Sequence, residues 1–290
     1  MKHTRTMGSA GYFSFAYEAN GNPFNTLFVK STGQPKNYEA HTEIGAPFAH
    51  KHDLAFFKGE IVGAATKEDQ YLDAENSIKL SALRIRTRLP LGGMYLPETE
   101  TVQGFENVDS LVQSGSLPES QRPYMSLWAM ETPYRISDIL DSFYLDEKEQ
   151  RQFLIDAAKH TQNLRSGPMV GFYEEFQGLL KSNKSTEALA LAWSLRVMDC
   201  LHDTFTGLAQ GNAVHTNMSA HNMSLHGELC DNSSVYFDQL NKTSLLAAEN
   251  QLHDHLGQFT REWNYPGAGK SFSEESVQKI NDKASADLQI

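Results

Sequence analysis

The stretch of residues 214–238 holds the side chains best suited to chemistry in this chain of 290 residues. Within it, His226-Gly227 separates two short alternating runs, which predicts a tight β-hairpin. Such a hairpin brings Asn222, at one end, beside Asp231, at the other. An amide oxygen next to a carboxylate offers hard oxygen ligands to Mg²⁺, which in turn holds phosphate oxygens. The sequence therefore predicts a magnesium and phosphate site here; the alternative is an ordinary surface hairpin with polar ends.

The same stretch resembles the signature of the selenoprotein O family, the kinase-fold protein adenylyltransferases. The chain reads HTNMSAHNMS from His215 to Ser224, and Asp231 follows nine residues after Asn222. The family pattern is HGxxNTDNMS, with an aspartate at the same spacing. By this resemblance Asn222 and Asp231 are the magnesium ligands, His215 opens the catalytic loop, and Ser219 stands where the family has its first asparagine.

The chain departs from the family pattern at His221, where the family has the aspartate expected to act as the base toward the incoming hydroxyl. A neutral imidazole can accept a proton near pH 7, so His221 is a candidate general base. Three outcomes stay open: a working histidine base, an enzyme that depends on positioning and metal, and a nucleotide binder that no longer transfers. Phosphoryl-type transfer depends chiefly on positioning and charge neutralisation, so the loss of the aspartate is compatible with activity.

Two further segments resemble family motifs that hold phosphates. Residues 129–137 read AMETPYRIS and resemble AxSH[LI]RxG, in which the arginine serves a phosphate; Arg135 would do so here through two parallel N–H donors. The alternative is that Arg135 forms a simple ion pair. Residues 27–33 read LFVKSTG and resemble the LxLKGxG strand that carries the ATP-binding lysine, which would be Lys30. Lys58 competes for this role, and we favour Lys30.

These residues need two kinds of element to position them. Residues 1–145 are rich in Gly, Pro, Thr and aromatic residues, which predicts mixed β structure with one or two helices and short strands at 26–30, 83–88 and 124–130. In the strand predicted at 83–88, Arg84, Arg86 and Arg88 alternate and would face one side. They would form a phosphate or acidic-partner face, or the protective charges of a solvated strand edge.

Residues 146–290 have a helical pattern. Apolar residues recur at steps of three and four over 145–164, 170–180 and 185–209, and two more helices are predicted at 243–263 and 274–288, after the β-like insertion at 214–238. The sequence thus predicts an α+β protein with a β-rich N-terminal lobe and a mainly helical C-terminal lobe. The resemblance makes this a protein-kinase-like two-lobed fold, with the ligand between the lobes.

Charge and composition exclude several classes of protein. With 36 acidic and 25 basic residues, the formal net charge is −11, which disfavours nonspecific nucleic-acid binding. No apolar run approaches the roughly 20 residues of a membrane span. Two cysteines without metal-type spacing build neither a disulfide framework nor a zinc site, and no apolar segment follows the basic residues near Met1. We therefore expect a cytoplasmic protein without a membrane span.

The function implied by the resemblance is a nucleotidyltransferase that uses ATP and Mg²⁺. It would transfer AMP, in preference to phosphate, to a hydroxyl of a protein or peptide, and such relatives also occur in the tailoring of secreted peptides. The alternative is a catalytically impaired pseudoenzyme that serves as a nucleotide-binding or purely protein-binding scaffold.

Overall fold

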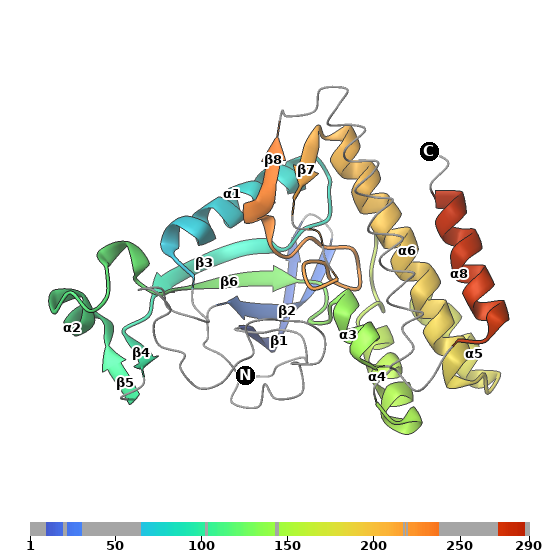
Figure 1. Ribbon diagram of the computed structural model, residues 1–290. Coiled ribbons are helices and arrows are strands. Elements are labelled where there is room, and N and C mark those ends of the chain that lie inside the picture. The colour runs from blue at the N-terminus through green and yellow to red at the C-terminus, as the bar shows by residue number, and fades with distance from the viewer. Residues whose placement is uncertain are drawn as a thin grey trace.

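The computed structural model describes residues 10–19, 22–30, 65–101, 104–142, 145–216, 218, 220–237 and 272–287. This part of the chain is a mixed α+β structure with a small antiparallel sheet and several helices (Figure 1). The strands are β1 (Ala10–Ala19), β2 (Asn22–Lys30), β3 (Leu89–Tyr95), β4 (Glu98–Thr101), β5 (Gly104–Asn107), β6 (Tyr124–Met130), β7 (Ala213–His215) and β8 (Val235–Phe237). The helices are α1 (Lys67–Ala82), α2 (Val108–Gln113), α3 (Ile136–Ser142), α4 (Glu147–Lys159), α5 (Phe172–Lys181), α6 (Thr186–Gln210) and α8 (Glu274–Asp287).

The main sheet has the strand order β1-β2-β6-β3, and every neighbouring pair is antiparallel. The strands predicted at 26–30 and 124–130 are confirmed, the first as part of β2 and the second as β6. In β6 the side chains of Tyr124, Ser126 and Trp128 are buried while those between them are half-buried, as expected for a central strand. Lys30, the last residue of β2, lies opposite Ser126.

The strand predicted at residues 83–88 is wrong. Helix α1 continues to Ala82, and Arg84 follows in the left-handed region with a φ of 62°. The Ile85 N–H donates to the Leu80 carbonyl at 3.0 Å, which is the bond of a Schellman helix end. Apolar residues and arginines alternate in this segment, which is the pattern expected of a strand. The left-handed backbone of Arg84 instead ends the helix and prevents a continuous extended segment. Only Thr87 in this segment forms a bridge, with Leu229.

The helical pattern of the second half is confirmed where the structure describes it. Ser185 caps α6, and its hydroxyl accepts the Ala188 N–H at 3.2 Å. Helices α4 and α5 lie close to the predicted ranges, and α8 agrees with the helix expected at 274–288. The helix expected at 243–263 lies outside the described residues. None of the helices in the described ranges is long and apolar enough to cross a bilayer.

The hairpin is confirmed as a tight turn at His226-Gly227. The Gly227 N–H donates to the Ser224 carbonyl at 3.0 Å, and Gly227 has a φ of 81°, which favours glycine. A Cβ atom there would also lie 3.1 Å from the Cys200 Cβ, so α6 packs directly against the turn. The Cys230 N–H donates to the Asn222 carbonyl at 2.9 Å, and Asn222 and Asp231 therefore sit at the same end of the hairpin.

Two buried apolar clusters support this arrangement. The larger one forms around α6, where Trp193 packs edge-on against Phe172 at 4.6 Å between ring centroids, and it extends to the hairpin through Leu225 and Leu229. The smaller one joins the sheet to the hairpin and consists of Phe28, Trp128, Met130 and Cys230. The hairpin is thereby fixed between the helices and the sheet, as Figure 1 shows for the loop that lies beside α3 and the end of β6.

Candidate functional site

Lys30 connects two carboxylates that come from distant parts of the chain. Its Nζ lies 3.0 Å from Asp231 Oδ1, although the two residues are 201 positions apart, and 3.4 Å from Asp73 Oδ2 in α1. The lysine side chain is 24% exposed and Asp231 is 33% exposed, whereas Asp73 is fully buried. A partly accessible cation thus lies between a buried acid on a helix and a more accessible acid at the end of the hairpin.

The environment keeps Asp231 ionised. Burial acts to raise the pKa of its carboxyl, but the charges of Lys30 and Arg88, the Lys30 hydrogen bond and the charge of Arg135 outweigh it and hold the pKa below the usual value. An ionised and partly exposed carboxylate is suited to binding a cation. The three basic residues around it would also attract anions such as phosphates.

Asp73 is held by three partners. Asp73 Oδ2 forms a buried ion pair with Arg88 and a longer contact with Lys30. Asp73 Oδ1 accepts a hydrogen bond from the Asn232 N–H at 3.0 Å. The Arg88 guanidinium carbon lies 3.9 Å from the centroid of the Trp128 ring, within the range of a cation–π contact. Arg88 therefore takes up much of the charge of Asp73, while Lys30 lies closer to Asp231.

Helix α1 is bound to the segment that follows Asp231 by buried amide groups. The Asn76 side chain donates to the carbonyls of Asn232 and Val235 at 2.8 and 3.0 Å. The Asn232 side chain donates in turn to the hydroxyls of Ser77 and Thr87 at 2.8 and 2.7 Å. Buried hydrogen bonds of this kind fix the position of α1 relative to the hairpin end, and with it the position of Asp73 relative to Asp231.

Arg135 lies against the loop that carries the other predicted residues. Its Nη1 donates to the His221 carbonyl at 2.6 Å, and its backbone N–H is capped by Asp138 at 2.7 Å. The guanidinium carbon is also 5.5 Å from the centroid of the Phe28 ring. The His221 side chain is exposed and that of Asn222 is half-buried. The exposed imidazole is thus accessible to a substrate, while the guanidinium fixes the backbone beside it.

The structure brings together most of the residues predicted from the sequence. Lys30 and Asp231 are in contact, and Arg135 contacts the loop of His221 and Asn222. The alternative lysine, Lys58, and the loop residue Ser219 lie outside the described residues. Among the described residues, the predicted site residues therefore lie close to the same hairpin.

Sequence reasoning named Arg88 but missed the buried polar residues of α1, among them its partner Asp73. The signal was the spacing of Gln70, Asp73 and Asn76-Ser77, which recur at steps of three and four and form the buried face of the helix. Because these residues are polar, the face does not have the apolar pattern that identifies a core-facing helix. Asp73 was therefore not among the residues identified from the sequence.

A second polar cluster lies behind the hairpin and consists of Glu131, His226 and Glu228. Arg86 forms an ion pair with Glu131, and the Glu131 N–H donates to Glu228 Oε1 at 3.0 Å. Burial raises the pKa of Glu228 to about 8, and the charge of Glu131 adds to this effect. Burial also acts to raise the pKa of Glu131, but contacts with His226 and Arg86 reverse the shift and lower it. Burial lowers the pKa of His226, which keeps the imidazole neutral near pH 7.

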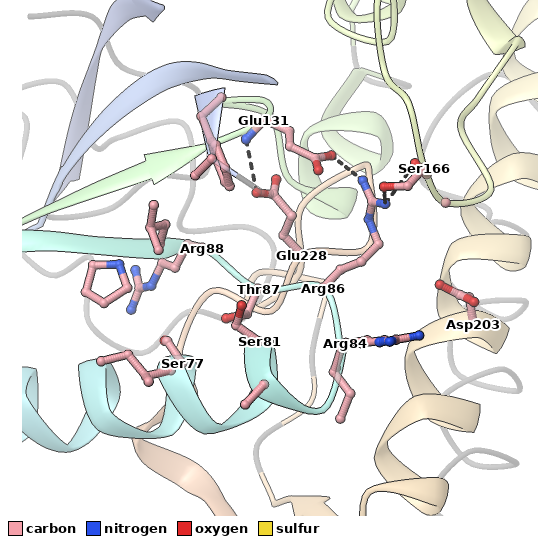
Figure 2. Close-up of a pocket in the computed structure, with 18 residues that line it drawn as sticks. Ser77, Ser81, Arg84, Arg86, Thr87, Arg88, Glu131, Ser166, Asp203 and Glu228 are labelled. Carbon is pink, nitrogen blue, oxygen red and sulfur yellow. Dashed lines mark hydrogen bonds and ion pairs between the residues drawn. The ribbon is translucent and has the colours of Figure 1, made fainter. Parts of the chain in front are cut away.

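A cavity of about 680 Å³ opens beside this second cluster. Glu131 and Glu228 line it together with all three arginines of residues 84–88, but Lys30 and Asp231 do not. Figure 2 shows that these arginines diverge: Arg86 points toward Glu131 and Ser166, Arg88 points away from them, and Arg84 extends toward Asp203. The single arginine face expected from strand alternation is therefore wrong.

Comparison with known proteins adds no relative to this description. The sequence matches no protein-family model, and no curated protein is significantly similar to it.

Proposed function

We propose that this chain binds ATP with Mg²⁺ at the Lys30–Asp231 pair and transfers AMP to a hydroxyl of a protein or peptide. The observation that carries the proposal is the contact of Lys30 with both Asp231 and Asp73. In protein kinases a strand lysine pairs with an acid on a neighbouring helix, and an aspartate and a loop asparagine hold magnesium. Here Lys30, Asp73, Asp231 and Asn222 have the corresponding element types, which supports a protein-kinase-like two-lobed fold.

The residues fit the ion that this proposal requires. Asn222 and Asp231 offer an amide oxygen and an ionised carboxylate at the same end of the hairpin, and Mg²⁺ prefers such hard oxygen ligands. Bound there, the ion would neutralise charge on the phosphates. Lys30 would exchange its contact with Asp231 for a phosphate oxygen, and Arg135 would contribute further positive charge.

In the transfer itself, the acceptor hydroxyl oxygen forms a bond to the α-phosphorus while the bond from that phosphorus to the bridging oxygen breaks. Pyrophosphate leaves, and the hydroxyl proton passes to a base. His221 is the candidate for this base, because its exposed side chain directly precedes the proposed metal ligand Asn222 in the chain. Attack on the γ-phosphorus would give phosphate transfer instead; the resemblance to the selenoprotein O family favours AMP.

A second candidate function is a scaffold that binds a protein partner, with or without nucleotide. Two features favour the scaffold. His221 stands where the selenoprotein O family has its aspartate, and buried side chains occupy the space beside Lys30. Phe28 lies two residues before Lys30 on the same face of β2, and it is fully buried against Trp128, Met130 and Cys230. An adenine ring would have to displace part of this cluster.

Thermal unfolding with ATP and Mg²⁺ tests the first step of the proposal. At a hundredfold excess over the dissociation constant, binding stabilises the folded state by about 2.7 kcal/mol, which corresponds to a rise in Tm of about 4 to 5 °C for a chain of 290 residues. Lys30→Met and Asp231→Asn should remove the shift. Lys279→Met is the matched control, because Lys279 is an exposed residue of α8 that forms an ion pair with Glu275 on the same helix.

ATP labelled separately at the α- and γ-phosphorus then distinguishes the reactions. Label from the α-position in an acceptor protein supports AMP transfer, and label from the γ-position alone supports phosphate transfer. Binding without either label supports the scaffold, with nucleotide. The absence of an ATP-dependent shift in the unmodified protein, or equal shifts in Lys30→Met and Lys279→Met, would contradict the nucleotide site.

A further inference from the structure

The cluster behind the hairpin joins three segments of the chain. Glu131 follows β6, His226 occupies the hairpin turn and Glu228 begins the second arm of the hairpin. These side chains are 4%, 0% and 1% exposed, and each offers one ligand atom within 4.8 Å of the others. A nitrogen and two carboxylate oxygens thus converge in a place from which most water is excluded.

The spacing is close to that of a tetrahedral metal centre. Bonds of about 2.0 to 2.1 Å from zinc to nitrogen and oxygen place neighbouring ligand atoms about 3.3 Å apart. His226 Nδ1 lies 3.3 Å from Glu131 Oε2, which is long for a hydrogen bond between these atoms. The Glu228 ligand atom lies within 4.8 Å of both, so its carboxyl group must move closer to join the same coordination sphere. The cavity lined by Glu131 and Glu228 offers a path of entry and room for a water as the fourth ligand.

Hydrogen bonds already orient the ligands, as they do around metal sites. Glu228 Oε1 accepts the Glu131 N–H, Glu228 Oε2 accepts the Ser224 hydroxyl at 3.0 Å, and Glu131 accepts Arg86. The other ring nitrogen of the buried imidazole, Nε2, has no hydrogen-bond partner among the described residues. Zinc on Nδ1 would leave Nε2 in the same state, so this nitrogen does not distinguish a metal centre from a purely hydrogen-bonded cluster.

The charges also favour a cation. Arg86 pairs with Glu131, so the cluster has a net negative charge once Glu228, whose pKa is about 8 without an ion, gives up its proton as metal binding requires. Arg86 opposes a cation electrostatically, and its Nη2 contacts Glu131 Oε2, the oxygen that lies nearest His226, so zinc would have to displace this contact or bind the other carboxylate oxygen. A neutral imidazole with two carboxylates is a donor set for zinc, whereas Mg²⁺ and Ca²⁺ prefer oxygen ligands alone.

We propose that Glu131, His226 and Glu228 form a zinc centre, separate from the Lys30–Asp231 site, that fixes the segment after β6 to the hairpin. The hairpin bears Asn222 and Asp231 at its other end, so the zinc ion would stabilise the part of the chain that positions them. Its role is structural, and it requires no nucleotide.

The test uses the full chain, dialysed first against a chelator and then against Zn²⁺. Mass spectrometry of the metal content should find about one zinc per chain after removal of free ion, and Zn²⁺ should raise Tm. His226→Gln and Glu228→Gln should weaken binding by about 100-fold or more. His202→Gln in α6 is the matched control, because His202 is a half-buried histidine outside the cluster and should leave zinc binding unchanged.

X-ray absorption of the zinc-loaded unmodified protein gives a readout that does not depend on the folding of variants. It should show one imidazole with oxygen ligands and no sulfur. Zinc–sulfur scattering at about 2.3 Å would assign the ion to the buried Cys200 or Cys230 and overturn the proposal. So would the absence of retained zinc, or equal zinc content in all variants. None of these measurements uses ATP, so they are independent of the outcome of the nucleotide experiment.

Discussion

Replacing Arg88 by methionine should destabilise the protein by about 3 to 4 kcal/mol. Arg88 is fully buried, pairs with the fully buried Asp73 and stacks on Trp128. Breaking a buried ion pair by removing one partner costs about 3 to 5 kcal/mol, because the remaining charge stays desolvated. The loss of the cation–π contact with Trp128 increases the destabilisation by about 1 to 2 kcal/mol. A contact between the methionine sulfur and the Trp128 ring would offset part of this loss. Lys30, already 3.4 Å from the same carboxylate oxygen, offsets part of the rest.

Urea unfolding followed by far-ultraviolet circular dichroism at pH 7 measures this difference as a change in the free energy of unfolding, with an unchanged denaturant slope. A double-mutant cycle separates charge from packing. Asp73→Asn keeps an acceptor for the Asn232 N–H but removes the charge, so in the Arg88→Met background it should restore about 2 kcal/mol. The same substitution alone should destabilise, since it leaves Arg88 buried without its acid.

Two outcomes would refute this reasoning. If Arg88→Met costs less than about 1 kcal/mol, the ion pair is not desolvated as the buried geometry requires. If the two substitutions are additive within about 0.5 kcal/mol, Asp73 and Arg88 are energetically independent despite their contact. Either result would also remove the basis for assigning the charge of Asp73 to Arg88 rather than to Lys30.

Two further predictions concern the cluster behind the hairpin and its surroundings. In chelator-treated protein, the pKa of Glu228 is about 8, against 4.5 in the unfolded chain, so the folded state binds the proton more tightly. The free energy of unfolding should therefore fall as the pH rises between these two values, by up to about 1.4 kcal/mol per pH unit, as urea titrations would measure. Glu228→Gln should remove this pH dependence. An unchanged slope in the variant would contradict the assignment. Gly167→Ala should destabilise by at least about 1 kcal/mol, because Gly167 has a φ of 85°, which strains any other residue, and a Cβ there would also displace the Arg86 guanidinium. Gly178→Ala in α5, with open space around it, should be neutral or stabilising. Similar Tm values for the two variants would contradict the strained backbone at Gly167.

Elements with strong local signals were predictable. The α6 helix has a serine cap and regular apolar spacing, β6 alternates, and the hairpin turn contains a glycine at the position that needs a left-handed backbone. The segment after α1 was not, because Leu83 and Ile85 alternate with arginines as strand residues do. Its conformation is decided by the helix end at Arg84, a position where glycine is usual and whose left-handed backbone no residue-type pattern reveals.

Part of the site was also predictable, because hairpin geometry is local. The nine-residue spacing and the His226-Gly227 turn sufficed to place Asn222 and Asp231 at one end of a hairpin. The contact with Lys30 could be expected only through the resemblance to a known family, since no local rule joins residues 201 positions apart.

The sequence by itself determined the local structure where its signals are strong: where α6 begins, where the hairpin turns, and which residue types are available for chemistry. Only the tertiary structure decided that Asp73 and Arg88 are buried together, and that Glu131 meets His226 and Glu228. The reason is that backbone conformation follows from neighbouring residues, whereas the burial of a charge depends on which distant segments exclude water from it.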